Sequence, residues 1–507
     1  MLHDRYKSWK ALLLQLGLTL HLALSVAGAQ PEPAYRAADC PRLLVLSERE
    51  GDTVVCGFLR VPESRTRPTD KTLELAVMTL RARGEARADP ILFLQGGPGG
   101  AALSTLELWQ NLPWRDERDI ILIDQRGTGY SRPNLKCPEI YDSAEVLSGV
   151  SRCRRRLLRA GHDLRAYNSA EDAADIADLR RALELEALNL YGVSYGTRLA
   201  LTVLRDHPEG VRSVVLDSAY PPQVNRLVEF GGNFERALSQ VFYSCRKDER
   251  CNAAFPTLRE DFLTAIADFN ESPLELTALD GLEISGDELL GFYFQSMYSE
   301  SVIPNLPYSV AKLLESDLNS AALLLSGVVS GEEVDSGRAN FLAVIRAVRE
   351  LLKWFWREVQ SEGVYFSTEC QEDVPFQSVA SVESRSRTLQ PVIGDFAVAT
   401  SRDQFSACRA WRVPRADALE TEAVTSDVPT LILAGSFDPI TPPRWGRVAG
   451  RSLSRSHFFE VPNAAHGVFL SGECPVAMVS EFLNTPLRPP NASCLEGTKV
   501  EFYIPGD

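Results

Sequence analysis

The sequence lacks an excess of positive charge. Its 507 residues carry 53 lysines and arginines against 68 aspartates and glutamates, which gives a formal net charge of −15. A surface with this balance has no overall attraction for a polyanion, so nucleic acid is excluded as an expected partner. The 45% hydrophobic and 24% charged residues are those of a folded chain. Disorder, a collagen helix and a coiled coil are excluded on the same composition.

Long apolar runs are also missing, except near the N-terminus. There three basic residues precede an apolar run over 11–26, and Ala27-Gly28-Ala29 follows, a pattern typical of a secretory signal peptide. The alternative is a membrane anchor, but the run is short for a spanning helix and contains Gln15 and His21. We therefore expect a leader over residues 1–29, no stable membrane insertion after its removal, and a periplasmic or extracellular protein.

No C-x-x-C pair occurs among the ten cysteines, and no histidine stands beside them at zinc-ligand spacing. An even number of cysteines in an exported chain favours disulfides, so we expect no metal site. The connectivity is open at this point, but pairing each cysteine with its nearest neighbour closes five loops without crossings. That pairing joins Cys40 to Cys56, Cys137 to Cys153, Cys245 to Cys251, Cys370 to Cys408, and Cys474 to Cys494.

Short apolar runs alternate with helical segments in two parts of the chain. The runs at 91–94 and 120–123 are wholly apolar, as in strands buried on both faces. A helix is expected from Ser169, where Ser169-x-x-Asp172 reads as a capping box. Further strands are expected at 73–80, 188–191, 211–216, 429–434 and 457–461. This rhythm predicts a mostly parallel α/β sheet with helices on both faces.

The α/β rhythm stops near residue 221 and returns near residue 427. The intervening segment is mostly amphipathic helix, with helices expected at 234–242, 289–298 and 341–356. We expect the first part of the core over residues 30–221, a helical cap insertion over 222–426, and the second part of the core over 427–507. A helical block in this position is well placed to cover the carboxyl ends of the strands.

One motif carries the chemistry of a nucleophile. Gly192-Val193-Ser194-Tyr195-Gly196 follows an expected strand and opens an expected helix, the context of a nucleophile elbow. We predict Ser194 as the nucleophile, with the backbone N–H of Tyr195 as one oxyanion donor. The second donor is expected in the glycine-rich loop after the strand at 91–94, at Gly97. The alternative is a glycine-rich structural turn with an ordinary serine.

A serine nucleophile on this fold requires an acid and then a histidine later in the chain. His466 lies in a loop of small residues just after the last expected strand, and we predict it as the base. Asp438 follows the preceding strand, and Pro439 prevents that strand from resuming, so Asp438 is the predicted acid. Asp217, at the end of the strand at 211–216, is the alternative.

The glycine-rich loop has a second interpretation. Gly97-x-Gly99-x-x-Ala102, with Asp124 closing a later strand, resembles a dinucleotide fingerprint. Pro98 removes one amide from any phosphate cradle, and a secreted protein rarely carries NAD, so we expect no cofactor. Asp124 and Arg126 are expected to form an internal ion pair that fixes the loop beside these glycines.

Together these motifs resemble a known family. The segments 96–99, 124–131 and 192–196, followed by Asp438 and His466, are similar to those of α/β-hydrolase peptidases of the prolyl iminopeptidase and tripeptidyl aminopeptidase group. The cysteine-rich form with a leader and a long insertion resembles the secreted tripeptidyl aminopeptidase branch. The resemblance implies an α/β-hydrolase fold with a large helical cap. It also implies a peptide substrate shortened from its free N-terminus.

Two features of the resemblance concern the substrate. Prolyl iminopeptidases usually have histidine where this chain has Gln95, so proline selectivity does not carry over. An aminopeptidase must also bind an ammonium group, and Glu369 and Glu372, next to Asp373, are candidates. A solvated acidic loop is the alternative for these residues.

Two other functions remain open: a carboxylesterase with the same triad and a non-catalytic binding protein.

Overall fold

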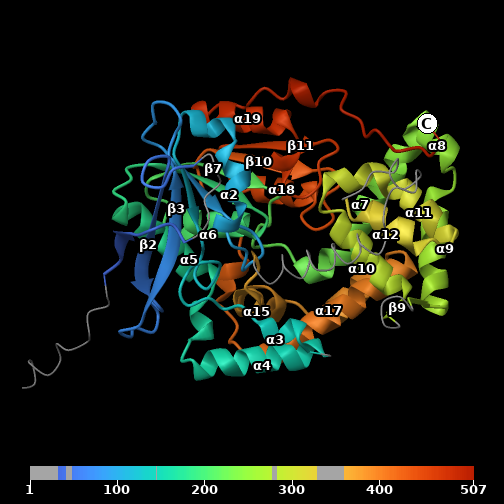
Figure 1. Ribbon diagram of the computed structural model, residues 1–507, viewed down its shortest axis with the longest axis horizontal. Coiled ribbons are helices and arrows are strands. Elements are labelled where there is room, and N and C mark those ends of the chain that lie inside the picture. Colours follow the sequence, from blue (N-terminus) through green and yellow to red (C-terminus); the bar gives the residue numbers. More distant parts are fainter. Residues whose placement is uncertain (1–31, 42–47, 144, 277–281, 328–358, 507) are drawn as a thin grey trace, which may run out of the picture.

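The computed structural model describes residues 32–41, 48–143, 145–276, 282–327 and 359–506 (Figure 1). The predicted leader and the helix expected at 341–356 lie outside these residues. Within them, no helix combines the length and the apolar character needed to span a bilayer.

A sheet of nine strands forms the centre, in the order β1-β2-β3-β5-β4-β6-β7-β10-β11. The first three strands and the β3–β5 pair are antiparallel, and every pair from β5 to β11 is parallel. The strands are β1 (Ala34–Ala37), β2 (Val54–Pro62), β3 (Thr72–Leu80), β4 (Ile91–Leu94), β5 (Ile120–Ile123), β6 (Leu188–Val193), β7 (Val211–Asp217), β10 (Thr430–Gly435) and β11 (Ser456–Val461).

Helices cover both faces of the sheet, because its central strands are apolar on both sides. Leu92 and Leu94 of β4 pack in one cluster with α5 (Ser169–Ala182) and α6 (Tyr195–Asp206). Ile91 and Phe93 pack in a second cluster, which includes side chains of α2 (Leu106–Gln110) and α19 (Glu473–Asn484). The predicted mostly parallel sheet with two covered faces is confirmed.

Most helices between β7 and β10 form a group of their own. They share an apolar cluster that includes Phe234, Phe262 and Tyr293, and Figure 1 shows α7 to α12 gathered at one end of the molecule. The elements of the whole segment are α7 (Arg226–Lys247), α8 (Glu249–Ala254), α9 (Leu258–Glu271), β8 (Leu274–Leu276), β9 (Leu282–Ile284), α10 (Gly286–Ser296), α11 (Leu306–Leu314), α12 (Leu318–Leu325), α15 (Glu362–Glu372), α16 (Val379–Ser386) and α17 (Pro391–Trp411).

Helix α15 departs from this group. Its residues Val364, Phe366 and Cys370 pack in the same apolar cluster as α5 and α6, together with Trp411 at the end of α17. Part of the segment expected as an insertion is therefore built into the core of the sheet.

The start of α5 corrects one prediction. The helix begins at Ser169 as expected, but the N-cap is Asn168, whose side chain accepts a hydrogen bond from the backbone N–H of Glu171. The predicted capping box of Ser169 and Asp172 is wrong, because the Ser169 hydroxyl is buried under α15 and lies 2.6 Å from a carboxylate oxygen of Glu372.

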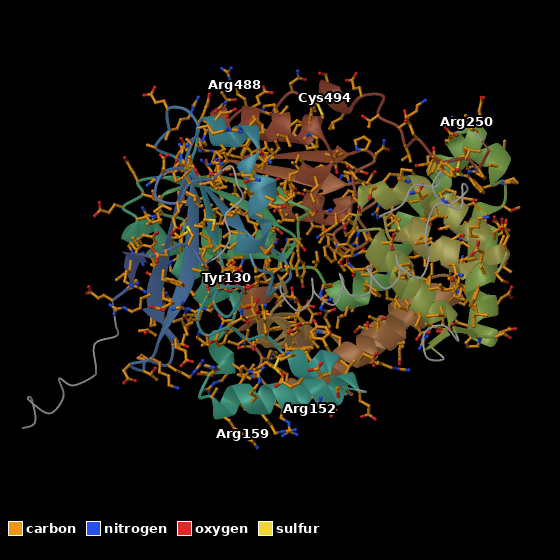
Figure 2. All side chains as sticks on the ribbon, in the orientation of Figure 1. Tyr130, Arg152, Arg159, Arg250, Arg488 and Cys494 are labelled. Atoms are coloured by element: carbon orange, nitrogen blue, oxygen red, sulfur yellow. A yellow bond between two sulfur atoms is a disulfide. The ribbon has the colours of Figure 1, made fainter. Side chains whose placement is uncertain are left out.

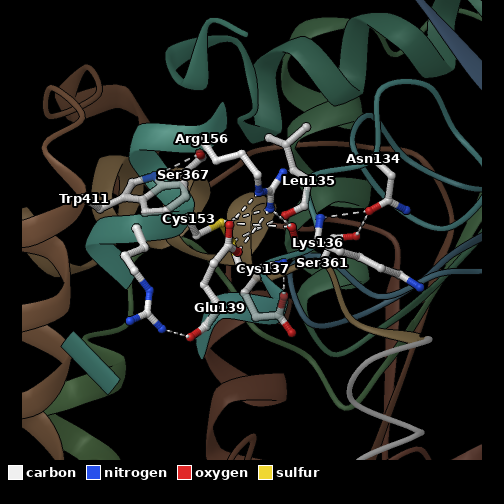
Figure 3. Close-up of a disulfide and its surroundings, with 12 residues drawn as sticks. Asn134, Leu135, Lys136, Cys137, Glu139, Cys153, Arg156, Ser361, Ser367 and Trp411 are labelled. Carbon is white, nitrogen blue, oxygen red and sulfur yellow. Dashed lines mark hydrogen bonds and ion pairs between the residues drawn. A yellow bond between two sulfur atoms is a disulfide. The ribbon is translucent and has the colours of Figure 1, made fainter. Parts of the chain in front are cut away.

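All five predicted disulfides are confirmed. The bridge between Cys137 and Cys153 ties α4 (Val146–Arg159) to the start of α3 (Pro138–Tyr141), as Figure 3 shows. Beside it, Arg156 donates to Glu139 over 2.5 Å. In the described parts of the chain, these two cysteines and Glu139 are the one group at metal-ligand spacing, but the disulfide leaves no thiolate there to bind a metal.

Candidate active site

The turn between β6 and α6 holds Ser194 in an unusual backbone conformation. Its φ is +58°, which few residues other than glycine adopt, and its backbone N–H donates to the carbonyl of Asp217. A Cβ at Gly192 would overlap the carbonyl of Gly196, and one at Gly196 would overlap the carbonyl of Leu94. Both glycines of the G-x-S-x-G motif are therefore required by the close packing of this turn.

The structure brings Asp438 and His466 together. Oδ2 of Asp438 lies 2.8 Å from Nδ1 of His466, and the carboxyl group is fully buried. The backbone N–H groups of Ile440 and Thr441 donate to Oδ1, and the Thr441 hydroxyl donates to Oδ2 over 2.6 Å. The carboxylate is thus held in one orientation by donors on both oxygens.

Electrostatics in this pair favour the charged forms. Burial raises the pKa of Asp438, but His466 and the Thr441 donors outweigh it and hold the pKa below its usual value. Burial lowers the pKa of His466, but the Asp438 carboxylate outweighs it, and the net shift of that pKa is upward. Asp438 therefore stays ionised near neutral pH and favours a proton on the imidazole.

Asp217, the alternative acid, has other partners. Its oxygens accept from the backbone N–H groups of Val468 and Phe469 at 2.7 and 3.0 Å and from the Tyr191 hydroxyl at 2.9 Å. It fixes the chain just after His466, while Asp438 makes the hydrogen bond to the imidazole.

Ser194 and His466 line one cavity of about 610 Å³, together with residues of helices that lie between β7 and β10 in the chain. Gly96 and Gly97 contribute to it, and a Cβ at Gly96 would lie 2.9 Å from the Cβ of Ser194. The aromatic lining residues come mainly from the insertion helices and the segments beside them: Tyr220, Phe230, Phe294, Tyr298, Tyr365, Phe396 and Trp445. The ring of Tyr298 lies 4.8 Å from that of His466.

The side chain of Tyr195 points away from this cavity. Its side chain is buried, and its hydroxyl lies 2.8 Å from the Ser169 hydroxyl on the core side. Its backbone N–H belongs to the first turn of α6, where N–H groups have no acceptor within the helix. Gly97 lines the cavity together with Ser194.

The expected ion pair between Asp124 and Arg126 is wrong. Two nitrogens of Arg126 donate to the two oxygens of Asp175 on α5, each at 2.8 Å. Asp124 accepts instead from the backbone N–H groups of Leu103 and Tyr130, at 2.9 and 2.7 Å. Each residue fixes a loop near the site, but through a different partner.

The two candidate glutamates lie in different surroundings. Glu369 lines the cavity and forms an ion pair with Arg226 of α7. Glu372 is held by the backbone N–H and hydroxyl of Ser169, both at 2.6 Å, and lies 3.5 Å from Arg198. Burial raises the pKa of Glu372 to about 7. Of the two candidates, Glu369 therefore lies in the lining of the cavity, whereas Glu372 is held in the core by Ser169.

A row of polar side chains on α7, which the sequence analysis did not predict, contacts the loop that carries Asp438. Glu229, Asn233 and Arg236 recur at helical spacing and so share one face of this helix. Arg236 donates to the carbonyls of Ser436 and Asp438, at 2.7 and 2.6 Å. Asn233 donates to the carbonyl of Ile440, and Glu229 accepts from Trp445 of α18 (Pro443–Gly450). The spacing of residues 229, 233 and 236 was the feature of the sequence that could have predicted this shared polar face.

Family comparisons match both parts of the core. Residues 89–248, which include Ser194, match the family described as alpha/beta hydrolase fold, and residues 391–494, which include Asp438 and His466, match the family described as TAP-like protein. The chain is an α/β-hydrolase. Together the two matches span just over half of this α/β-hydrolase.

Similar proteins carry peptidase names. Serine protease Hip1 of Mycobacterium tuberculosis is 22% identical over 467 residues, which cover 87% of this chain and 86% of that protein. Tripeptidyl aminopeptidase of Streptomyces coelicolor is 26% identical over 57% of this chain and 59% of its own length. Proline iminopeptidase of Lactobacillus delbrueckii is 28% identical over 29% of this chain and 44% of its own. The resemblance of this α/β-hydrolase to that peptidase group is confirmed.

Proposed function

We propose that this α/β-hydrolase is a serine aminopeptidase that acts on peptides with a free N-terminus. The Ser194 hydroxyl attacks the scissile carbonyl while His466 takes its proton, and the N–H groups of Tyr195 and Gly97 stabilise the oxyanion. His466 then protonates the leaving amine, and water hydrolyses the acyl-enzyme. The observation that supports this most is the Asp438–His466 hydrogen bond beside the cavity that Ser194 lines.

Charged residues in and next to the cavity lining support recognition of an ammonium group. Glu369 and Asp373 both approach Arg226, Asp373 over 3.4 Å, so two carboxylates share one guanidinium. Among the described residues, Oδ2 of Asp373 is buried without a hydrogen bond. A bound ammonium group would balance the remaining negative charge.

The compartment belongs to the same proposal. Five disulfides in the described residues fit an oxidising environment outside the cytoplasm, as the predicted leader requires. We also expect the helices α7 to α12 to form a cap that closes the cavity at one end. A closed end suits an enzyme that cleaves at a fixed distance from the N-terminus of its substrate.

Glu369→Gln is expected to lower kcat/KM for free peptides by about 30-fold or more, because truncating one partner of a desolvated charge pair typically costs about 2 to 5 kcal/mol. A small neutral ester, which reaches Ser194 without that contact, should be hydrolysed as before. Steady-state kinetics on both substrates measure the difference. Glu383→Gln, the same change in a half-buried residue of α16 that pairs with Arg402 on the helix surface, is the matched control.

A substrate series separates peptidase from esterase. Free peptides, their N-acetylated forms and short-chain esters should be compared at equal enzyme concentration, and we expect the free peptides to be preferred. The preference should weaken above about pH 8, where an α-amino group loses its charge. Equal rates for acetylated and free peptides, with no effect of Glu369→Gln, would instead support the carboxylesterase.

The row of polar side chains on α7 yields a further prediction. Arg236→Met removes both donors to the loop that carries Asp438, so we expect kcat to fall about 10- to 100-fold while KM changes little, since small misplacements of reacting groups have effects of this size. Arg236→Lys should restore part of the activity. A fall in thermal stability with unchanged kcat would show that Arg236 has a structural role only.

A further inference from the structure

Helix α4 is strongly basic in an otherwise acidic chain. It carries five arginines between residues 152 and 159: Arg152, Arg154, Arg155, Arg156 and Arg159. Figure 1 places α4 along the lower edge of the molecule, and Figure 2 shows Arg152 and Arg159 pointing away from the protein there. A concentration of positive charge in a chain of net charge −15 indicates an anionic partner for this edge.

Few acidic groups balance this charge. Arg156 pairs with Glu139, while Arg152, Arg155 and Arg159 form no ion pair with any of the described residues. Of the acidic residues nearest in sequence, Asp163 forms ion pairs with Arg67 and Arg165, and Glu145 is the N-cap at the other end of the helix. The C-terminal half of α4 therefore presents positive charge that the protein itself does not neutralise.

The same helix exposes large apolar side chains. Val146 is 60% exposed, Leu147 42% and Leu158 41%. Nine large hydrophobic side chains are exposed in the described residues, and three of them lie on this one helix of 14 residues. Exposed apolar residues among arginines are typical of helices that lie in a membrane interface.

A basic cavity of about 450 Å³ adjoins the end of α4. Its positive lining residues are Arg67, Lys71, Arg154, Arg165 and Arg412, against the acidic Glu63 and Asp163. In this part of the structure Nη2 of Arg67 is buried and has no hydrogen-bond partner. Burial and the neighbouring Arg412 both lower the pKa of Arg154. An anion such as a phosphate group would relieve that repulsion and supply the missing acceptor.

We propose that α4 and this basic cavity dock the protein on an anionic lipid bilayer. The arginines would contact lipid phosphates, and Val146, Leu147 and Leu158 would enter the interface. A lipid surface fits better than an acidic protein because the exposed apolar side chains need a partner as well as the charges. At physiological ionic strength, acidic groups of the protein that lie farther from the membrane than a Debye length of about 8 Å are screened.

The proposed membrane-binding surface on α4 is held in place by the fold. The Cys137–Cys153 bridge (Figure 3) holds α4 near its middle, and α17 contacts this helix. Binding therefore requires no ordering of this segment, and its charges are fixed in position before the membrane is met.

The test is vesicle binding by the full chain. Vesicles of equal parts phosphatidylglycerol and phosphatidylcholine should bind the protein in a sedimentation assay at about 0.15 M salt, and pure phosphatidylcholine vesicles should not. The triple variant Arg152→Gln, Arg155→Gln and Arg159→Gln should bind about 100-fold more weakly, since each basic residue near an anionic surface contributes about fivefold. Raising the salt to about 1 M should release the wild-type protein.

Matched variants make the outcome decisive. Arg246→Gln, Arg250→Gln and Arg488→Gln remove the same charge elsewhere; Figure 2 labels the last two away from α4. Equal loss in this control, or equal binding to neutral vesicles, would overturn the proposal. Binding of inorganic phosphate that depends on Arg67 and Arg412, without vesicle binding, would do the same. Hydrolysis of a small ester should be unchanged in the α4 variant, which shows that it is folded.

Discussion

Replacing Ser194 with alanine is expected to abolish hydrolysis of peptides and esters alike, with a loss of turnover of about 10⁶-fold, as when serine nucleophiles are removed from other hydrolases. The physical reason is that the turn with positive φ places Ser194 in the cavity beside His466, whereas the hydroxyl of the next residue, Tyr195, is buried against Ser169. Labelling by a fluorophosphonate should disappear in the same variant, because the probe needs the activated hydroxyl.

Ser104→Ala is the matched control for this loss. Its hydroxyl donates to the carbonyl of Ala101 near the glycine-rich loop, and its removal should leave labelling intact. Covalent labelling that persists in Ser194→Ala and maps to another serine would contradict the assignment of the nucleophile. Loss of labelling in both variants would point to damage of the loop.

Asp438→Asn is expected to lower turnover about 10⁴-fold with the fold intact. An amide at this position can donate to Nδ1, which stabilises the wrong tautomer of His466. The pH profile provides a second readout. His466 must be uncharged to accept a proton, so activity is lost as the pH falls through its pKa, which Asp438 raises. Without that negative charge the pKa falls, and the acid limb of kcat/KM should move to lower pH.

Asp217→Asn is the natural comparison. It removes charge from a group that holds the backbone of Val468 and Phe469, so we expect a loss of stability of about 1 to 3 kcal/mol and a much smaller loss of turnover. Thermal unfolding and kinetics of both variants measure the two effects. A larger loss of turnover in Asp217→Asn than in Asp438→Asn would instead identify Asp217 as the acid.

Features encoded over short stretches were predictable from the sequence. The strands at 91–94 and 120–123 match the structure because a wholly apolar run between turn residues has no other place than the centre of the sheet. The G-x-S-x-G turn is specified by glycines that the local packing requires. The disulfides follow chain proximity, which made the nearest-neighbour pairing correct.

Features that depend on distant partners were not predictable. Arg126 could be recognised as buried, but the choice between Asp124 and Asp175 depends on how α5 packs against the loop. Glu369 and Glu372 lie three residues apart on α15. Which of them lines the cavity depends on the packing of this helix, because Glu372 contacts Ser169 of α5 whereas Glu369 lines the cavity. The N-cap of α5 was misassigned for the same reason, because Ser169 has a partner more than 200 residues away.

The position of α15 limits how the protein can be taken apart. Excising residues 222–426 to obtain a smaller, open catalytic domain would also delete Glu372 and the apolar side chains that α15 places against α5 and α6. Arg198 would then be left buried without its carboxylate, which is strongly destabilising. A minimal version of this α/β-hydrolase must therefore keep α15 and the end of α17, joined to the sheet by new connections, and can dispense only with helices that lie outside the core.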